Sequence, residues 1–135
     1  NHIQQKIQQY IDKVISKLKF NDFSLESTLI NSCLVNKYHD GNSCITPHCD
    51  SSLSFGDRPL IVGLSIGDTR KIVFRKKDNQ TKQQFSNNPI VLDKELSDNS
   101  VFIMGGDSQL NYTHEIPKEE DKKVRYSFTF REMII

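Results

Sequence analysis

The chain has 135 residues, a length that suits one domain with its own hydrophobic core. Hydrophobic residues make up 36% and charged residues 26% of it, a balance that excludes a wholly disordered chain, a coiled coil and a collagen-like repeat. With 18 basic and 17 acidic residues the net charge is only +1, so any contact with nucleic acid has to come from a local basic patch.

The first segment predicts an amphipathic helix over residues 1–19. Its apolar residues recur at three- and four-residue steps, with Gln, Lys and Asp between them: Ile3, Ile7, Tyr10, Ile11, Val14, Ile15 and Leu18. This spacing places them on one helix face. We expect the helix to dock that face on the rest of the domain.

Over residues 29–131 the pattern changes to short runs rich in Val, Ile, Phe and Tyr, which are typical of β-strands. The expected strands are Leu29–Tyr38, Leu60–Ile66, Arg70–Arg75, Ile90–Leu92, Ser100–Met104, Leu110–Ile116 and Val124–Arg131. Residues 76–88 and 117–123 are expected to be exposed loops. Many short strands after one helix favour a mainly-β fold, a sandwich or jelly roll, in a single domain over residues 1–135.

A candidate metal site begins at His48-Cys49-Asp50. On an extended segment, residues two apart point to the same side, so His48 and Asp50 can face one metal while Cys49 faces away. A second imidazole completes a two-histidine, one-carboxylate triad suited to ferrous iron. His114, which follows Tyr112-Thr113, is the expected third ligand.

Zinc is the alternative at this segment, because His39, Cys44, His48 and Cys49 are close together in the sequence. Their spacing does not match the paired Cys-x-x-Cys arrangement of structural zinc sites. We therefore rank a structural zinc site below an iron site.

The end of the chain alternates strictly between polar and apolar residues. Tyr126, Phe128 and Phe130 share one face of the expected strand, and the opposite face carries Arg125, Ser127, Thr129 and Arg131. Such alternation usually means an edge strand with a solvated polar face. The alternative is a pocket for a dianion, because Arg binds carboxylates through bidentate charge-assisted hydrogen bonds.

Together these motifs resemble the AlkB family of iron(II)- and 2-oxoglutarate-dependent dioxygenases. The resemblance runs from about Cys33 to Arg131. It includes the His-x-Asp pair, the second His and the Arg-x-Ser-x-Thr-x-Arg strand. Asn36-Lys37-Tyr38 is similar to the family's Asn-x-Tyr pair, and Gly105-Gly106 is similar to its turn before the second His.

The resemblance implies a double-stranded β-helix and the cofactors Fe(II), 2-oxoglutarate and O₂. It implies that His48, Asp50 and His114 bind iron. Arg125, with Ser127 and Tyr38, would hold the distal carboxylate of 2-oxoglutarate. Arg131 and Asn36 would lie near the carboxylate beside the keto group.

The implied activity is oxidative removal of N-methyl groups from nucleic-acid bases. Ser127 stands where many members have Asn, as in some RNA-demethylating members, and Ser52 stands where several members have an acidic base-recognition residue. The compact size is similar to the AlkB domains of plant RNA virus polyproteins, and the first residue is Asn1. We expect an N-methylated RNA substrate ahead of single-stranded DNA, and a place in a larger polyprotein.

A basic run follows from Arg70 to Lys77. In strand geometry Lys71, Arg75 and Lys77 share one face. Such a face is often a solvated edge that discourages aggregation, but it can also track phosphates. We predict that these three residues contact nucleic acid.

The chain has three cysteines, Cys33, Cys44 and Cys49. A small and odd number of cysteines argues against a disulfide framework and indicates a reducing compartment. No apolar stretch is long enough to span a membrane, and no signal peptide is visible. We expect a cytoplasmic monomer without membrane contact, in the host cytoplasm if the chain is viral.

Two alternatives to a nucleic-acid demethylase stay open. The first is a dioxygenase of the same fold that hydroxylates a protein or a small molecule. The second is a non-catalytic RNA-binding jelly roll. Turnover of 2-oxoglutarate, and its dependence on methylated oligonucleotides, distinguishes them.

Overall fold

The computed structural model describes residues 2–17, 29–77 and 87–134. It contains helices α1 (His2–Lys17), α2 (Ser52–Phe55) and α3 (Ser108–Asn111), and strands β1 (Ser32–Tyr38), β2 (Ile45–His48), β3 (Ile61–Gly67), β4 (Arg70–Lys76), β5 (Ile90–Leu96), β6 (Ser100–Met104), β7 (Tyr112–Ile116) and β8 (Arg125–Arg131). No helix among the described residues is both long and apolar enough to cross a bilayer.

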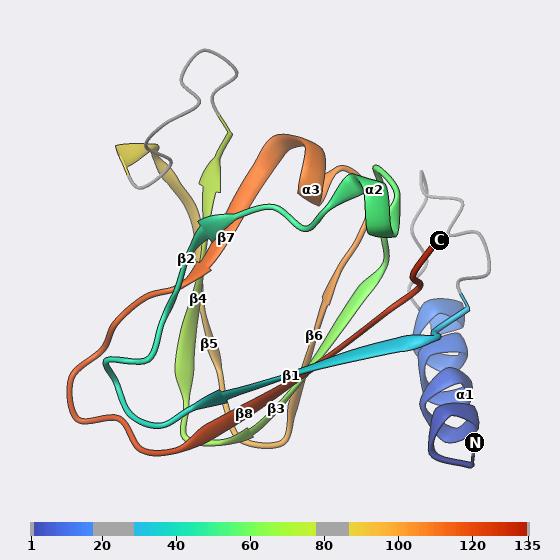
Figure 1. Cartoon of the computed structure of the whole chain (residues 1–135), viewed down its shortest axis with the longest axis horizontal. Helices are drawn as coiled ribbons and strands as arrows, with labels where there is room; N and C mark the ends of the chain where they lie inside the picture. The colour runs from blue at the N-terminus through green and yellow to red at the C-terminus, as the bar shows by residue number, and fades with distance from the viewer. Residues whose placement is uncertain (1, 18–28, 78–86, 135) are drawn as a thin grey trace.

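The strands form two four-stranded antiparallel sheets (Figure 1). One sheet has the order β1-β8-β3-β6, and the other has the order β2-β7-β4-β5. Except for β4 and β5, strands that are adjacent in each sheet are not consecutive in the sequence, as in a jelly roll. The expected mainly-β jelly roll with an N-terminal helix is confirmed.

The main core lies between the two sheets, where the buried side chains are Tyr38, Ile61, Ile72, Phe74, Leu96, Met104 and Ile116. A second apolar cluster lies under α1, where Ile11 packs with Ile30, Leu60 and Val62. The exposed fraction of Ile11 is only 1%. The expectation that the helix docks its apolar face is therefore confirmed.

Polar contacts also fix α1 beside the start of β1. Gln4 Nε2 donates to the carbonyl of Ile30 at 2.8 Å, and Gln8 Oε1 accepts the Ile30 N–H at 2.9 Å. The helix was expected over residues 1–19, and residues 1, 18 and 19 lie outside the described part of the chain.

Three expectations about the strands are wrong in detail. The strand expected from Leu29 begins only at Ser32. The strand expected at Leu110–Ile116 begins only at Tyr112, because the N–H groups of Leu110 and Asn111 both bond the carbonyl of Asp107 and close a helical turn. The strand expected at Ile90–Leu92 continues to Leu96, paired along β4. The short strand β2 was not expected, and most of the loop expected at residues 76–88 lies outside the described residues.

The alternation in β8 has a clear structural meaning. Its polar side chains face the space between the sheets, where Arg125 and Arg131 are buried to exposed fractions of 2% and 7%. Phe130, on the opposite face, packs against the α1 cluster. The solvated-edge interpretation of this strand is therefore wrong, because β8 is a central strand between β1 and β3.

Candidate functional site

Three potential metal ligands meet at one end of the space between the sheets. His48 ends β2, Asp50 follows two residues later, and His114 lies in β7. Strands β2 and β7 pair so that His48 is directly opposite His114. One ligand atom from each of the three residues lies within 4.8 Å of the others. The sequence-predicted triad is therefore assembled in space.

The surrounding groups hold this triad in a ligand-ready state. His48 Nδ1 lies 2.9 Å from the carbonyl oxygen of Thr46. A carbonyl only accepts, so Nδ1 is the donor in this contact and Nε2 is the nitrogen left for a metal. His48 Nε2 is 3.8 Å from Asp50 Oδ1. Burial, followed by the nearby His48 and Arg131, lowers the pKa of His114 to about 3. The imidazole is then neutral, which is the form that binds metals.

Asp50 is itself fixed by two contacts. Its backbone N–H donates to Gln109 Oε1 at 2.9 Å, and its Oδ2 accepts from Arg131 Nη1 at 3.1 Å. The Arg131 guanidinium is covered by the ring of Phe55, 4.5 Å from the ring centroid. Contacts of this kind orient a ligand before the metal arrives.

The residues present fit ferrous iron. Two imidazoles and one carboxylate are the donor set that this ion prefers when exchangeable positions must stay open. The buried His114 Nδ1 has no hydrogen-bond partner among the described residues. An unpartnered buried nitrogen is costly, so this imidazole keeps a bonding capacity that the described residues do not satisfy.

The opposite end of the space holds a buried, unpaired cation. Arg125 Nη2 donates to Ser65 Oγ at 2.8 Å, but its Nε and Nη1 have no partner in the described residues. The ring of Tyr38, buried to 3% exposure, lies 4.9 Å from the guanidinium carbon. Burial lowers the pKa of Arg125 and raises that of Tyr38. A buried guanidinium without a counter-ion is destabilising, so this end of the space is suited to bind an anion.

One cavity of about 370 Å³ joins the two ends. Its walls carry the metal triad and a set of mostly apolar side chains. The polar residues that line it are Asn36, Tyr38, His48, Asp50, Ser65, His114, Arg125, Ser127, Thr129 and Arg131. Every residue expected to bind iron or 2-oxoglutarate is therefore placed around one space. Their individual roles stay predictions.

Comparison with known proteins agrees with this geometry. Residues 1–131 match the family model described as the 2OG-Fe(II) oxygenase superfamily. The chain belongs to this superfamily. Its cofactors are therefore Fe(II), 2-oxoglutarate and O₂, as the sequence resemblance implied.

Within the superfamily the similar proteins are AlkB homologues. The chain is 34% identical over 110 residues to mouse alpha-ketoglutarate-dependent dioxygenase alkB homolog 3. The aligned region covers 78% of this chain and 37% of the mouse protein. The chain is 27% identical over 125 residues to human DNA oxidative demethylase ALKBH2, covering 90% of this chain and 47% of that protein. The chain thus spans less than half the length of these relatives.

A solved structure shows the same fold. The structure of OsALKBH1 matches with a TM-score of 0.63 and 18% sequence identity, covering 96% of this chain and 64% of that one. The AlkB resemblance is confirmed, whereas the resemblance to viral polyprotein domains stays a hypothesis.

Two polar residues of the site were missed in the sequence. Ser65 Oγ accepts a hydrogen bond from Arg125, and Gln109 Oε1 accepts one from the Asp50 N–H. Ser65 is an isolated polar residue inside an apolar strand, which could have signalled a role. Gln109 follows the Gly-Gly turn, and nothing in the sequence indicates that it meets Asp50.

The basic run does not form one free cationic surface. Lys71 Nζ lies 3.4 Å from Asp93 Oδ2, and Arg75 Nε donates to Glu115 Oε1 at 2.8 Å. The backbone N–H of Lys77 bonds the carbonyl of Asn111, which places Lys77 beside α3 at the metal end. The nucleic-acid role of these residues stays a prediction.

Proposed function

We propose that this chain is an iron- and 2-oxoglutarate-dependent oxidative demethylase of N-methylated nucleic-acid bases, with RNA preferred to DNA. The observation that carries the chemistry is the single cavity that joins the metal triad to the unpaired Arg125 guanidinium. The names of the similar proteins, which include a DNA oxidative demethylase, support nucleic acid as the substrate class. Ser127, shared with some RNA-demethylating members, supports the preference for RNA.

In this proposal the cosubstrate lies along the cavity. Arg125 binds its distal carboxylate, since two nitrogens of the guanidinium, Nε and Nη1, have no partner among the described residues. Arg131 and Gln109 keep Asp50 oriented toward the metal position. His114 stays neutral and contributes a lone pair. The apolar part of the lining, including Ile61, Ile72 and Phe102, excludes bulk water from the reaction.

Iron held by His48, Asp50 and His114 would supply, with O₂ and 2-oxoglutarate, an oxidation in which one oxygen atom of O₂ enters succinate as CO₂ leaves and the other hydroxylates the N-methyl group, which is then lost as formaldehyde. The target base has to leave its stack to reach the cavity, because the metal triad is recessed between two sheets. A single-stranded substrate avoids much of that cost.

Mass spectrometry of methylated oligonucleotides tests the proposal. RNA and DNA oligonucleotides of the same sequence, each with one N-methylated base, are incubated with the protein, Fe(II), ascorbate and 2-oxoglutarate. We expect loss of 14 mass units (CH₂) per methyl group, faster for RNA, and no loss with Asp50→Ala. Succinate formation that no oligonucleotide accelerates would instead favour a protein or small-molecule substrate, and no succinate at all would favour a non-catalytic binding protein.

A further inference from the structure

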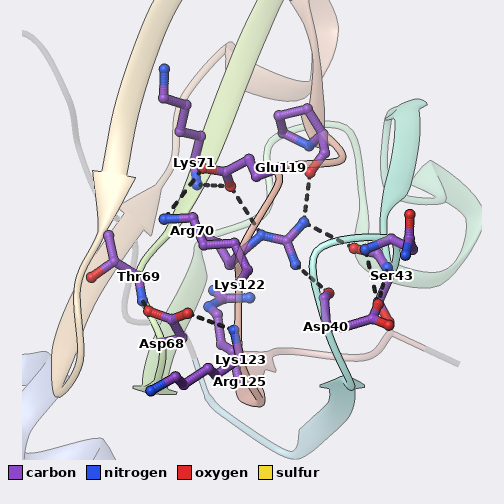
Figure 2. A network of polar contacts seen from close by, with 12 residues as sticks. Asp40, Ser43, Asp68, Thr69, Arg70, Lys71, Glu119, Lys122, Lys123 and Arg125 are labelled. Atoms are coloured by element: carbon purple, nitrogen blue, oxygen red, sulfur yellow. Dashed lines mark hydrogen bonds and ion pairs between the residues drawn. The ribbon is translucent and has the colours of Figure 1, made fainter.

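A second arginine is fully buried near the anion end of the cavity. Arg70, the first residue of β4, has an exposed fraction of 0%. Its Nε donates to Glu119 Oε2 at 2.9 Å, its Nη1 to the carbonyl of Asp40 at 3.1 Å, and its Nη2 to the carbonyls of Ser43 and Pro117 at 2.9 and 2.6 Å (Figure 2). In contrast to Arg125, each terminal nitrogen of this guanidinium has an acceptor.

These acceptors belong to two loops that flank Tyr38 and Arg125, the side chains proposed to bind 2-oxoglutarate. Residues 39–44 directly follow Tyr38, and residues 117–124 directly precede Arg125. The loops also touch each other, since the Glu119 N–H bonds the carbonyl of Gly41, and a Cβ at Gly41 would overlap the Glu119 carbonyl oxygen. Arg70 thus joins two loops that are distant in sequence, at the point where both enter the site.

Arg70 also contacts the site through Tyr38. Its guanidinium carbon lies 5.4 Å from the centroid of the Tyr38 ring, and that of Arg125 lies 4.9 Å from the same centroid. Tyr38 and Arg125 line the cavity, whereas Arg70 does not. Any influence of Arg70 on a bound ligand therefore passes through these neighbours.

The charge of Arg70 is already neutralised. Although burial acts in the opposite direction, hydrogen bonds from the Lys71 N–H and from Arg70 hold the pKa of Glu119 below its usual range. Glu119 therefore stays ionised beside Arg70. Of the two guanidinium groups around Tyr38, that of Arg70 is paired with Glu119, whereas that of Arg125 keeps two nitrogens without a partner in the described part of the chain.

We propose that Arg70 is a positioning residue for 2-oxoglutarate. It fixes the Tyr38 ring and the loop that leads into Arg125, so that the free N–H groups of Arg125 keep one direction toward the distal carboxylate. This inference rests on the proposed function, because it assigns a task to Arg70 at the same site. A fixed neighbour reduces the ordering that a ligand would otherwise have to impose.

The test compares cosubstrate affinity with metal affinity in the 135-residue chain. Arg70→Lys keeps the charge but loses the planar fork that reaches several acceptors. The matched control is Glu115→Gln, which weakens a second Arg–Glu pair on β4, Arg75–Glu115 at 2.8 Å, away from the cavity lining. Anaerobic calorimetry with Mn(II) in place of iron gives the Kd of 2-oxoglutarate, and the absorption bands of Co(II) report metal binding.

We expect Arg70→Lys to weaken 2-oxoglutarate binding about tenfold while metal affinity changes less than about twofold, on the scale observed for residues that orient a ligand through another residue. Glu115→Gln is expected to leave both affinities unchanged. If Arg70→Lys does not fold, Glu119→Gln, which retains one acceptor oxygen, replaces it with an expected loss of about threefold.

Three results would count against this inference. An unchanged Kd for 2-oxoglutarate in the Arg70 variant would overturn it. Equal losses of metal and 2-oxoglutarate affinity would also overturn it, since they would indicate a purely structural role. Absence of 2-oxoglutarate binding in the unaltered chain would overturn the proposed function itself.

Discussion

Gln109 and Asp50, 59 positions apart in the sequence, meet through a 2.9 Å hydrogen bond from the Asp50 N–H to Gln109 Oε1. Gln109 is buried, with an exposed fraction of 6%, and its own helix α3 lies between the Gly-Gly turn and β7. The bond therefore connects the segments that carry two of the metal ligands, Asp50 and His114. We infer that it fixes the backbone from which Asp50 projects.

Replacing Gln109 by Met should lower metal affinity about 10- to 100-fold, because the Asp50 N–H loses its acceptor and the carboxylate loses its orientation. Titration of the chain with Co(II), followed by visible absorption, measures the change. Gln4→Met is the matched control, since Gln4 makes one comparable bond to the backbone of Ile30 far from the site. Equal metal affinity in the two variants would show that the Gln109 bond serves only folding.

Removing a metal ligand should abolish turnover. His48→Ala, Asp50→Ala and His114→Ala each leave two ligands, and both affinity and geometry depend on all three. Succinate release per minute measures the effect. His39→Ala is the control, because His39 is exposed and lies outside the triad. Iron-dependent turnover that survives in His114→Ala would rule out the assigned triad.

Truncating Arg125 should raise the 2-oxoglutarate concentration required for turnover. Arg125→Ala removes a charge-assisted contact in a buried site, a loss of about 2–5 kcal/mol. Arg125→Lys should restore only part of it, because a single ammonium does not reproduce the planar fork. The exposed Lys123 provides a control, and Lys123→Ala should match the unaltered chain. A normal 2-oxoglutarate titration of Arg125→Ala would place the distal carboxylate elsewhere.

Arg125 should also lower the free energy of unfolding of the chain when no ligand is bound. A buried guanidinium with two unpartnered nitrogens costs free energy. Arg125→Met should therefore raise the free energy of unfolding of the ligand-free chain by about 1–3 kcal/mol. Chemical denaturation with and without 2-oxoglutarate measures this, and only the unaltered chain should gain stability from the ligand. A less stable Arg125→Met protein would mean that Arg125 serves the fold itself.

Within the basic run 70–77, Lys77 should matter more for nucleic-acid binding than Lys71. Lys71 already pairs with Asp93, whereas Lys77 lies beside α3 at the metal end. Lys77→Glu should weaken oligonucleotide binding and reduce the slope of log affinity against log salt by about 1, and Lys71→Glu should do less. Affinities at two salt concentrations test this. Identical salt slopes in the two variants and the unaltered chain would show that Lys71 and Lys77 do not contact phosphates.

The sequence predicted the parts of the site that depend on local geometry. Period-two alternation placed Arg125 and Arg131 on one face of β8, and the His-x-Asp spacing placed His48 and Asp50 together, as the structure has them. It did not reveal which face of β8 points inward, because that depends on β8 lying between β1 and β3. The family resemblance, not the alternation, identified the inward face.

Arg70 shows why the rest of the site could not be predicted. In the sequence it begins a basic run of ordinary surface appearance, yet it is the most deeply buried charge near the cavity. Its burial is created by loops at residues 39–44 and 117–124, whose approach no local pattern indicates. The same is true of Gln109, whose partner Asp50 is reached only through the pairing of β2 with β7.

Because Arg125 and Arg131 both lie on β8, the strand fixes the distance between the two ends of the cavity. Arg131 is tied to Asp50 at the metal end, and Arg125 closes the other end. Their separation along the strand, roughly 20 Å between backbone positions, is fixed by a paired central strand that cannot stretch or slide without breaking its hydrogen bonds to both neighbours. The paired strand therefore fixes the distance between the metal end and Arg125, and we expect a keto acid one carbon shorter than 2-oxoglutarate not to reach Arg125 when it also reaches the metal.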